Sequence, residues 1–186
     1  MAKENKSRYA ILGMLSQGPR SGYAIKRAIE QSVANFWNES YGQIYPILKQ
    51  LADEGLTTSH AEKQEGKPER YVYTLTDKGR EELRRWLSEP VEYVVERQEL
   101  LLKLFFGREG SVFDAIKHVQ QFRNMQAQLL QKYEGIADHL QRCCEDDPGA
   151  QYQLITVRYG QHRTRALIEW CDETLATLRT KAGATD

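Results

Sequence analysis

Long hydrophobic runs and cysteines are both scarce in this chain of 186 residues. No apolar run approaches the roughly 18 to 20 residues that a membrane-spanning helix needs, and the segment from Met1 to Ser7 lacks the apolar stretch of a signal peptide. We therefore expect a cytoplasmic protein with no membrane partner. The three cysteines, Cys143, Cys144 and Cys171, form neither a CxxC pair nor an even framework, which indicates reduced and mostly buried thiols.

Net charge is also absent, because 26 Lys and Arg residues balance 26 Asp and Glu residues. Phosphate binding depends on Lys and Arg, so this neutrality by itself argues against a protein that binds nucleic acid. The distribution along the chain weakens that argument, since residues 1–50 carry seven basic residues and three acidic ones. We expect a local basic surface in this part of the chain.

The common catalytic motifs are missing as well. The sequence has no phosphate-binding glycine loop, no GxSxG motif and no HExxH motif, so we do not expect an enzyme or a cofactor. One alternative is a metal site, because His139 and Cys143 are spaced i, i+4, and His162 and Cys171 follow on the next predicted helix. A cysteine on an amphipathic helix more often belongs to the core, so we favour a structural role and no metal.

A helix-turn-helix pattern occupies the first part of the chain. Helical spacing of apolar residues predicts helices over about 7–17 and 21–32, the second one capped by Ser21. A third helix should end at Gly55, with Pro46 near its start. This helix either begins near Gly42 or has an irregular first turn. Its buried face should hold Ile44, Ile47, Leu48 and Leu51.

A predicted β-hairpin follows the third helix. Two short strands are expected over 56–64 and 70–75, joined by a turn at 66–68. Thr76 then caps a helix that ends before Pro90. Two helices followed by a basic hairpin are typical of a winged helix-turn-helix, whose shape suits the major groove of DNA.

The second half of the chain contains only helical patterns. We predict helices over 91–106, 112–144 and 151–178, and place an N-terminal winged helix-turn-helix domain at 1–89 and a helical dimerisation domain at 90–186. The predicted fold class is therefore mainly α with a small β-hairpin.

Two long helices of the second half carry apolar stripes, which need each other and a second subunit for burial. The candidate dimerisation residues are Val119, Phe122, Leu129, Tyr133, Ile136, Leu140, Ile155, Tyr159 and Trp170.

Polar residues around the start of the third helix are the candidates for double-stranded DNA binding. A groove-reading helix places such side chains against base edges, and Gln43 is the best candidate for this role. Most contacts to DNA go to the backbone, for which the neighbouring hydroxyls and cations are suited. The full set of candidates is Tyr23, Lys26, Ser40, Tyr41, Gln43, Tyr45, Lys49, Lys67 and Arg70.

Each of these assignments has a structural alternative. Tyr23 and Tyr45 would then pack on the core with their hydroxyls exposed, and Arg70 would pair with Glu62. The winged helix as a whole would then be a protein-interaction module that does not bind DNA.

Three motifs together resemble the PadR family of transcriptional regulators. They are the Ser21-Gly22-Tyr23 segment, the Gly42-Gln43-Ile44-Tyr45-Pro46 segment with Leu48, Leu51, Gly55 and Leu56, and a hairpin that ends with Tyr71, Leu75, Thr76 and Gly79. The second half is similar to the helical C-terminal domain of the longer subgroup, typified by the virulence activator AphA.

This resemblance implies a homodimer that is joined through its C-terminal helices and binds an inverted-repeat operator. It also implies a repressor whose affinity for DNA a small molecule modulates. By position, Tyr23, Tyr45 and Lys49 match DNA-contact residues of the family, and residues 67–70 match its basic wing. The sequence departs from the family at Glu69 and at Gln64-Glu65, where acids stand in the wing.

Aromatic residues near the predicted domain junction are candidates for an effector pocket. Trp86, Tyr93, Phe105 and Phe106 would suit a small aromatic or apolar ligand, because aromatic walls favour flat apolar molecules. The alternative is ordinary packing between the domains.

Overall fold

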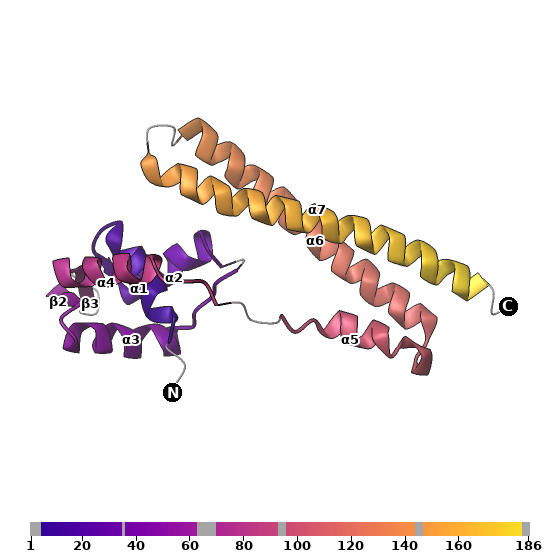
Figure 1. The fold of residues 1–186 in the computed structure, drawn as a ribbon, viewed down its shortest axis with the longest axis horizontal. Helices are drawn as coiled ribbons and strands as arrows, with labels where there is room; N and C mark the ends of the chain where they lie inside the picture. The colour runs from indigo at the N-terminus through magenta and orange to yellow at the C-terminus, as the bar shows by residue number, and fades with distance from the viewer. Residues whose placement is uncertain (1–4, 35, 63–69, 93–95, 144–146, 184–186) are drawn as a thin grey trace. The chain divides into compact units, whose positions relative to one another are not determined.

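The computed structural model describes residues 5–34, 36–62, 70–92, 96–143 and 147–183 (Figure 1). It divides into two compact units, Met1–Tyr93 and Val94–Asp186, of which each is described by itself. Among the described residues, no helix is both long enough and apolar enough to cross a membrane.

Four helices and a small antiparallel sheet form the N-terminal unit, as the sequence predicts. The elements are α1 (Ser7–Ser16), β1 (Arg20–Ser21), α2 (Gly22–Gln31), α3 (Tyr41–Asp53), β2 (Thr57–Glu62), β3 (Arg70–Leu75) and α4 (Asp77–Leu87). The strand order is β1-β3-β2. The first of these strands was not predicted, because two residues are too few to show a period; it pairs with β3 through Arg20 and Tyr73.

Side-chain caps set the helix boundaries in this unit. The Ser21 hydroxyl accepts a hydrogen bond from the Ala24 N–H at 3.3 Å, and the Thr76 hydroxyl accepts one from the Gly79 N–H at 3.0 Å. Gly55 follows α3 with a φ of +72°, which glycine adopts without strain. These predicted caps and the predicted stop are confirmed.

Pro46 lies inside α3, which begins at Tyr41, so the first of the two predicted alternatives is observed. Proline has no N–H, and the carbonyl of Gly42, four residues earlier, therefore lacks its helical partner. The helix continues because its apolar face is fully buried: Ile44, Leu48 and Leu51 are 0% exposed.

The C-terminal unit contains α5 (Glu99–Phe105), a short 3-10 helix η1 (Gly107–Glu109), α6 (Val112–Cys143) and α7 (Pro148–Gly183). The predicted helix over 91–106 is wrong in its first half, because the described residues before Glu99 are not helical. Val91 is β-branched, which lowers the helix propensity of the described residues that follow Pro90. Pro148 is the first residue of α7, where its fixed φ suits a helix start.

The two long helices run side by side in opposite directions and bury their stripes against each other (Figure 1). Val119, Tyr133 and Leu140 of α6 are buried within the chain against residues of α7 such as Val157 and Cys171.

This pairing buries most of the candidate dimerisation residues within the chain. Among the candidates, Leu129, Ile136, Phe122 and Trp170 also pack in these clusters. Only Ile155 and Tyr159 are largely exposed. The candidate residues of α6 therefore pack within the chain, and the two exposed candidates both lie on α7.

We expect Gly160→Ala to destabilise the helix pair. A Cβ at this position would lie 2.3 Å from the Tyr133 ring, and overpacking of this kind costs about 1–3 kcal/mol. Gly135→Ala is the matched control in α6, because its Cβ would meet open space and alanine favours a helix by about 0.5–1 kcal/mol. Urea unfolding at fixed protein concentration measures both, and equal unfolding free energies for the two variants would contradict this packing.

Candidate nucleic-acid interface

The third helix has one buried face and one exposed face, as a groove-reading helix requires. Ile44, Ile47 and Leu48 anchor it in the core, whereas the side chains of Gln43 and Lys49 are exposed on the opposite side. Tyr41 and Tyr45 are also exposed, although both are large aromatic residues. The predicted division of α3 between core and surface is thus present in the structure.

A capping box at the start of α3 uses the side chain of Gln43. Its Oε1 accepts hydrogen bonds from the Ser40 backbone N–H and from the Ser40 hydroxyl, each at 3.0 Å. A glutamine that reads adenine uses both its oxygen and its nitrogen. Gln43 has only the nitrogen available while the cap is intact, so it would donate to a base acceptor rather than form a bidentate pair.

Two tyrosines bring the starts of α2 and α3 together. The rings of Tyr23 and Tyr41 are stacked, with centroids 6.3 Å apart and planes at 11°. Partial burial, followed by the nearby Tyr23, raises the pKa of the Tyr41 hydroxyl above its usual value. This hydroxyl is therefore protonated at neutral pH and can donate to a phosphate. Helix N-termini also favour anions, so the surface combines two kinds of phosphate-binding group.

Tyr45 lies across Gly22, at the first residue of α2. A Cβ on Gly22 would be 2.7 Å from the Tyr45 ring, so only glycine allows this close approach. The ring packs, as in the structural alternative, but 51% of the residue remains exposed. Packing and availability to a ligand are therefore compatible at this position.

Tyr71, on β3, was not among the candidates for DNA binding. It is exposed. Burial, followed by the effects of Tyr45 and Tyr71, raises the pKa of the Tyr73 hydroxyl above its usual value. The sequence feature that could have identified Tyr71 is its position near the start of the second predicted strand, beside the predicted turn.

The structure contradicts the prediction that Lys26 contacts phosphate. Its side chain is mostly buried, and its ammonium group donates to Asn38 Oδ1 at 3.1 Å and pairs with Glu30 at 3.1 Å. Lys26 thus holds α2 to the segment before α3. Its position one turn after Tyr23 explains the error, because spacing does not reveal which polar groups lie opposite.

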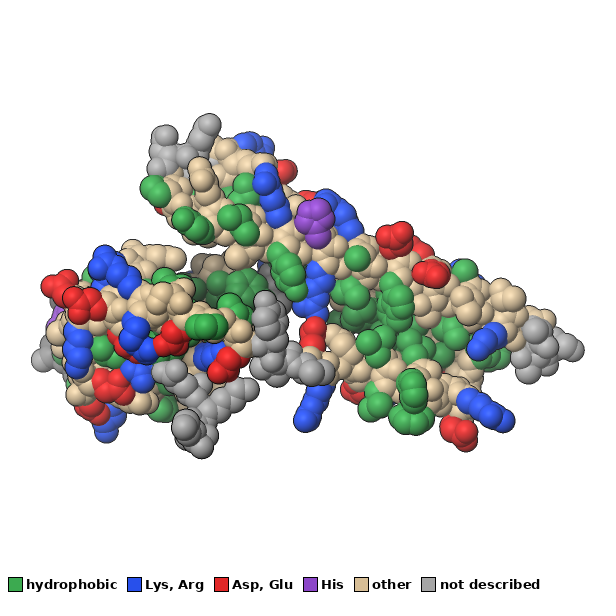
Figure 2. All heavy atoms as spheres, viewed as in Figure 1, with side chains coloured by type: hydrophobic (Ala, Val, Ile, Leu, Met, Phe, Trp, Pro, Cys, Tyr) green, Lys and Arg blue, Asp and Glu red, His purple; other side chains and the backbone are tan. Residues whose placement is uncertain are grey.

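The wing candidates have different outcomes. Arg70 pairs with Glu62 directly across the hairpin, at 2.5 Å, so the structural alternative is the observed contact. Lys67 lies outside the described residues. Figure 2 shows acidic and basic side chains interspersed over the visible face of the N-terminal unit, rather than a single basic patch.

The four effector candidates are divided between the two units. Trp86 stacks on Tyr9 in the N-terminal unit, with ring centroids 4.6 Å apart, and lines a cavity of about 290 Å³ there. Phe105 and Phe106 meet edge to face in the C-terminal unit, at 5.1 Å. Tyr93 lies outside the described residues.

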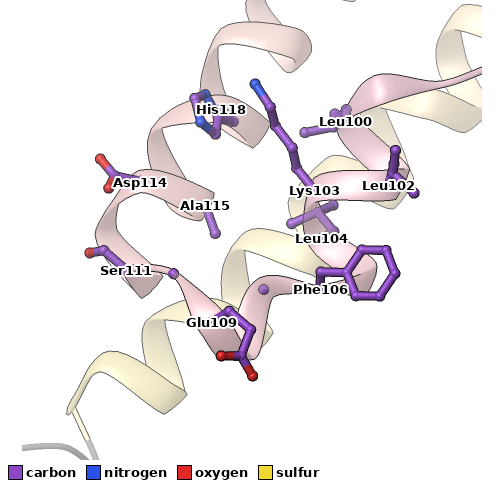
Figure 3. A pocket seen from close by; sticks show the side chains of 12 residues that line it. Leu100, Leu102, Lys103, Leu104, Phe106, Glu109, Ser111, Asp114, Ala115 and His118 are labelled. Atoms are coloured by element: carbon purple, nitrogen blue, oxygen red, sulfur yellow. The ribbon is translucent and has the colours of Figure 1, made fainter.

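A second cavity of about 430 Å³ lies between α5 and α6 in the C-terminal unit. Phe106 lines it, and Figure 3 shows Lys103 of α5 extending toward His118 of α6. The remaining wall is mostly apolar, with Leu100 and Leu104 from α5.

No cluster of potential metal ligands occurs in the part of the chain that the structure describes. His139 and His162 are exposed, whereas Cys171 is buried beside Val119. Burial raises the pKa of the Cys171 thiol, as expected for a core cysteine.

Comparison with known proteins gives two family matches. Residues 11–85 match the Transcriptional regulator PadR-like family, and residues 96–179 match the Virulence activator alpha C-term family. The chain is 33% identical, over 179 residues, to the negative transcriptional regulator PadR of Bacillus subtilis, with 92% of this chain and 96% of that protein covered.

Solved structures of similar proteins include complexes. B. subtilis PadR with operator DNA superposes with a TM-score of 0.80 at 30% identity, covering 94% of this chain and 99% of that one. The same protein with p-coumaric acid gives 0.76 at 28% identity, with 94% and 99% covered. The virulence activator AphA of Vibrio cholerae gives 0.74 at 26% identity, with 94% and 98% covered.

The capping box generates a prediction for Gln43→Glu. Glutamate keeps the acceptor for Ser40, so the unfolding free energy should stay within about 0.5 kcal/mol of the wild type. The substitution removes the amide donor and adds a negative charge facing DNA, so duplex affinity should fall at least about tenfold. Gln43→Ala is the comparison, because loss of the cap costs about 1 kcal/mol. Anisotropy titration and urea unfolding test both, and unchanged affinity of the glutamate variant would exclude Gln43 from the interface.

Proposed function

The chain belongs to the PadR family of transcriptional regulators, a family of DNA-binding proteins rather than enzymes, and from this premise we propose that it is a homodimeric repressor. It would bind an inverted-repeat operator, with an affinity that a small aromatic or apolar effector modulates. One observation carries the proposal: the exposed polar face of α3 lies beside the start of α2, joined to it by the stacked Tyr23 and Tyr41.

In the proposed complex, the anchored α3 enters the major groove. The hydroxyls of Tyr23 and Tyr41 would donate to phosphates, together with the backbone N–H groups at the two helix starts. Gln43 would donate to a base edge, and Lys49, six residues further along α3, would meet the backbone or a base. Lys67 and the wing would add a contact outside the helix.

Dimerisation would occur through the C-terminal unit. Its exposed apolar side chains support this, and Figure 2 shows hydrophobic side chains gathered along the visible face of this unit. The exposed large apolar residues of this unit lie on α5, α6 and α7 and directly after α5, namely Leu101, Leu102, Phe105, Phe106, Phe113, Met125, Tyr152, Ile155 and Tyr159. Apolar patches of this kind mark interfaces. A dimer would hold two α3 helices at the spacing of successive major grooves, about 34–36 Å.

A small-molecule effector is proposed because the chain resembles a protein whose structure is known with p-coumaric acid. An effector that prefers one arrangement of the dimer by about 2.7 kcal/mol would change operator affinity about a hundredfold. The competing function is a protein-interaction module, which the neutral net charge favours. Titration with the promoter region of its own gene separates the two, because an interaction module would show no preference over random duplex.

Lys49→Ala should weaken binding to operator and to random duplex alike and lower the salt slope by about one, because a phosphate contact releases counterions whatever the sequence. Lys132→Ala is the matched control, since Lys132 is an exposed lysine on α6. Anisotropy titrations over a range of salt concentrations provide the slopes. Equal slopes for the wild type and the Lys49 variant would exclude a phosphate contact.

The double variant Ile155→Glu, Tyr159→Glu should be monomeric and should lose at least about tenfold in operator affinity. Both residues are 63% exposed in the single chain, so the substitutions should leave its helicity unchanged. Gln153→Glu, on another face of α7, is the charge control and should remain dimeric. Sedimentation velocity measures the state of each, and a dimeric double variant would remove these two residues from the interface.

A further inference from the structure

We propose that the backbone carbonyl of Gly42 reads a base edge in the major groove, and that Pro46 makes this carbonyl available. The inference rests on the proposed function, because it adds a specificity determinant to α3. Pro46 lies inside α3 and has no N–H to donate to the carbonyl four residues earlier. The first turn of α3 therefore presents a strong backbone acceptor without its helical donor.

The Gly42 carbonyl belongs to the side of α3 that is turned away from the core. Gly42, Pro46 and Lys49 are exposed and are spaced i, i+4, i+7. The buried line of the helix has the same spacing, two residues further along, and consists of Ile44, Leu48 and Leu51. Two residues correspond to about 200° around the helix axis, so the two lines lie nearly opposite each other. The exposed line is thus the part of α3 that enters the groove in the proposed complex.

Neither packing nor backbone conformation requires glycine at position 42. Outside the backbone of its own helix, a Cβ built there would meet only the Ser40 hydroxyl oxygen among the described residues, at 3.8 Å. The φ angle of Gly42 is not in the left-handed region, which Gly55 does occupy. Glycine also weakens a helix relative to other residues. A bare backbone at this exposed position instead suits the close approach of a ligand to the chain.

Hydration of this carbonyl makes it selective for a donor. The ring of a proline inside a helix pushes against the carbonyl four residues earlier and turns it outward, where water hydrates it on an exposed face. Entry into the groove removes that water, and a base edge without a donor would then leave the acceptor unpaired, which is unfavourable. The major-groove donors are the amino groups of adenine, at N6, and of cytosine, at N4. The Gly42 carbonyl is therefore assigned to an adenine or a cytosine.

The neighbouring side chains leave this acceptor role to the backbone. Lys49 can only donate. Gln43 Oε1 already accepts from the Ser40 N–H and hydroxyl, each at 3.0 Å, so its amide nitrogen is what remains for DNA. The hydroxyl of Tyr45 can donate or accept. Among these groups the Gly42 carbonyl alone is restricted to accepting, so it alone requires an amino group opposite.

The first step is tested in the protein without DNA by Pro46→Ala, which restores an N–H at position 46. The variant should be at least as stable as the wild type, because alanine favours a helix interior. We expect this N–H to exchange with solvent at least tenfold more slowly than in an unfolded peptide, since it donates to the Gly42 carbonyl. Hydrogen exchange followed by NMR measures the rate. Exchange at the unfolded rate would overturn the assignment of this carbonyl as a helical acceptor that Pro46 leaves without its donor.

A second variant carries lactic acid in place of Pro46 and is the matched control. Lactic acid has the methyl side chain of alanine, but an ester oxygen takes the place of the N–H. The two variants therefore differ in the donor at position 46, and both lack the proline ring. If the Gly42 carbonyl reads a base, the lactic acid variant should discriminate between bases as the wild type does, and Pro46→Ala should not.

The base is identified with operator duplexes in which single adenines are replaced by purine and single cytosines by pyrimidin-2-one, since each analogue lacks only the exocyclic amino group. We expect one position in each half-site where the analogue weakens wild-type binding at least about fivefold. The lactic acid variant should lose the same factor. Pro46→Ala should lose less than twofold, because its carbonyl is satisfied within the helix. The analogue that causes the loss decides between adenine and cytosine.

Three results of this scan would overturn the proposal. Equal losses for the wild type and Pro46→Ala would show that the Gly42 carbonyl is not the acceptor. A loss in the wild type that is absent from both variants would assign the effect to the proline ring. The absence of any sensitive position would show that no amino group is read in this way.

The close approach of the backbone to DNA is tested by Gly42→Ala. This variant should be more stable than the wild type and yet bind the operator at least fivefold more weakly, because the added methyl group lies between the backbone and the base edge. Gly135→Ala is the matched control, since its Cβ also meets open space but lies on α6, and its operator affinity should stay within twofold. Unchanged affinity of Gly42→Ala would contradict the close approach.

This inference and the proposed function fail in different ways. If the wild type prefers no operator over random duplex, the proposed function fails and the reading of a base by Gly42 fails with it. If the operator preference is intact and no amino group responds to Pro46→Ala, only the role of the Gly42 carbonyl fails.

Discussion

Burial of the apolar face of α3 is the constraint on which the proposed DNA-binding surface depends. Ile44, Leu48 and Leu51 are completely inaccessible to solvent and fix the rotation of the helix about its axis. The orientation of the exposed side chains on the opposite face of α3 follows from this buried face. A helix with a proline in its interior would otherwise bend or fray, and here the loss of one backbone hydrogen bond is outweighed by packing.

Polar groups near α3 are mostly committed to structure before any ligand arrives. Lys26 holds Asn38 and Glu30, and Arg70 holds Glu62. These commitments leave hydroxyl groups and helix N-termini as the prominent donors, and the neutral net charge is consistent with this arrangement. Recognition that relies on short, oriented donors is less dependent on long-range attraction than recognition by a lysine-rich surface.

Periodicity and caps were enough to predict most of the fold, because the helices α1, α2, α3 and α6 have clear apolar stripes with Ser, Thr or Gly at their ends. What periodicity does not reveal is the partner of a stripe. The α6 residues Val119 and Tyr133 belong to an intrachain seam, although their pattern suits a dimer equally well. The strand β1 was missed because a two-residue strand has no period.

The exposure of the candidate DNA-binding residues was easier to predict from the sequence than their contacts within the chain. Tyr23, Tyr45 and Lys49 are exposed, as their predicted role requires, whereas Lys26 is buried. The Ser40–Gln43 spacing is itself a capping-box signature, so its use in the fold was readable from sequence. The neighbours of Lys26 were not, since Asn38 comes close only through the turn between α2 and α3.

The antiparallel pairing of α6 with α7 has a consequence for how the molecule is made. Helices that are adjacent in the chain can zip together from their connecting turn, with little loop to close at each step. Each polypeptide can complete its long hairpin alone, and in the proposed dimer the association with a second copy would be a separate, bimolecular event. The supply of assembled regulator would therefore follow the square of the subunit concentration when subunits are dilute, which makes its abundance in the cell a control in its own right.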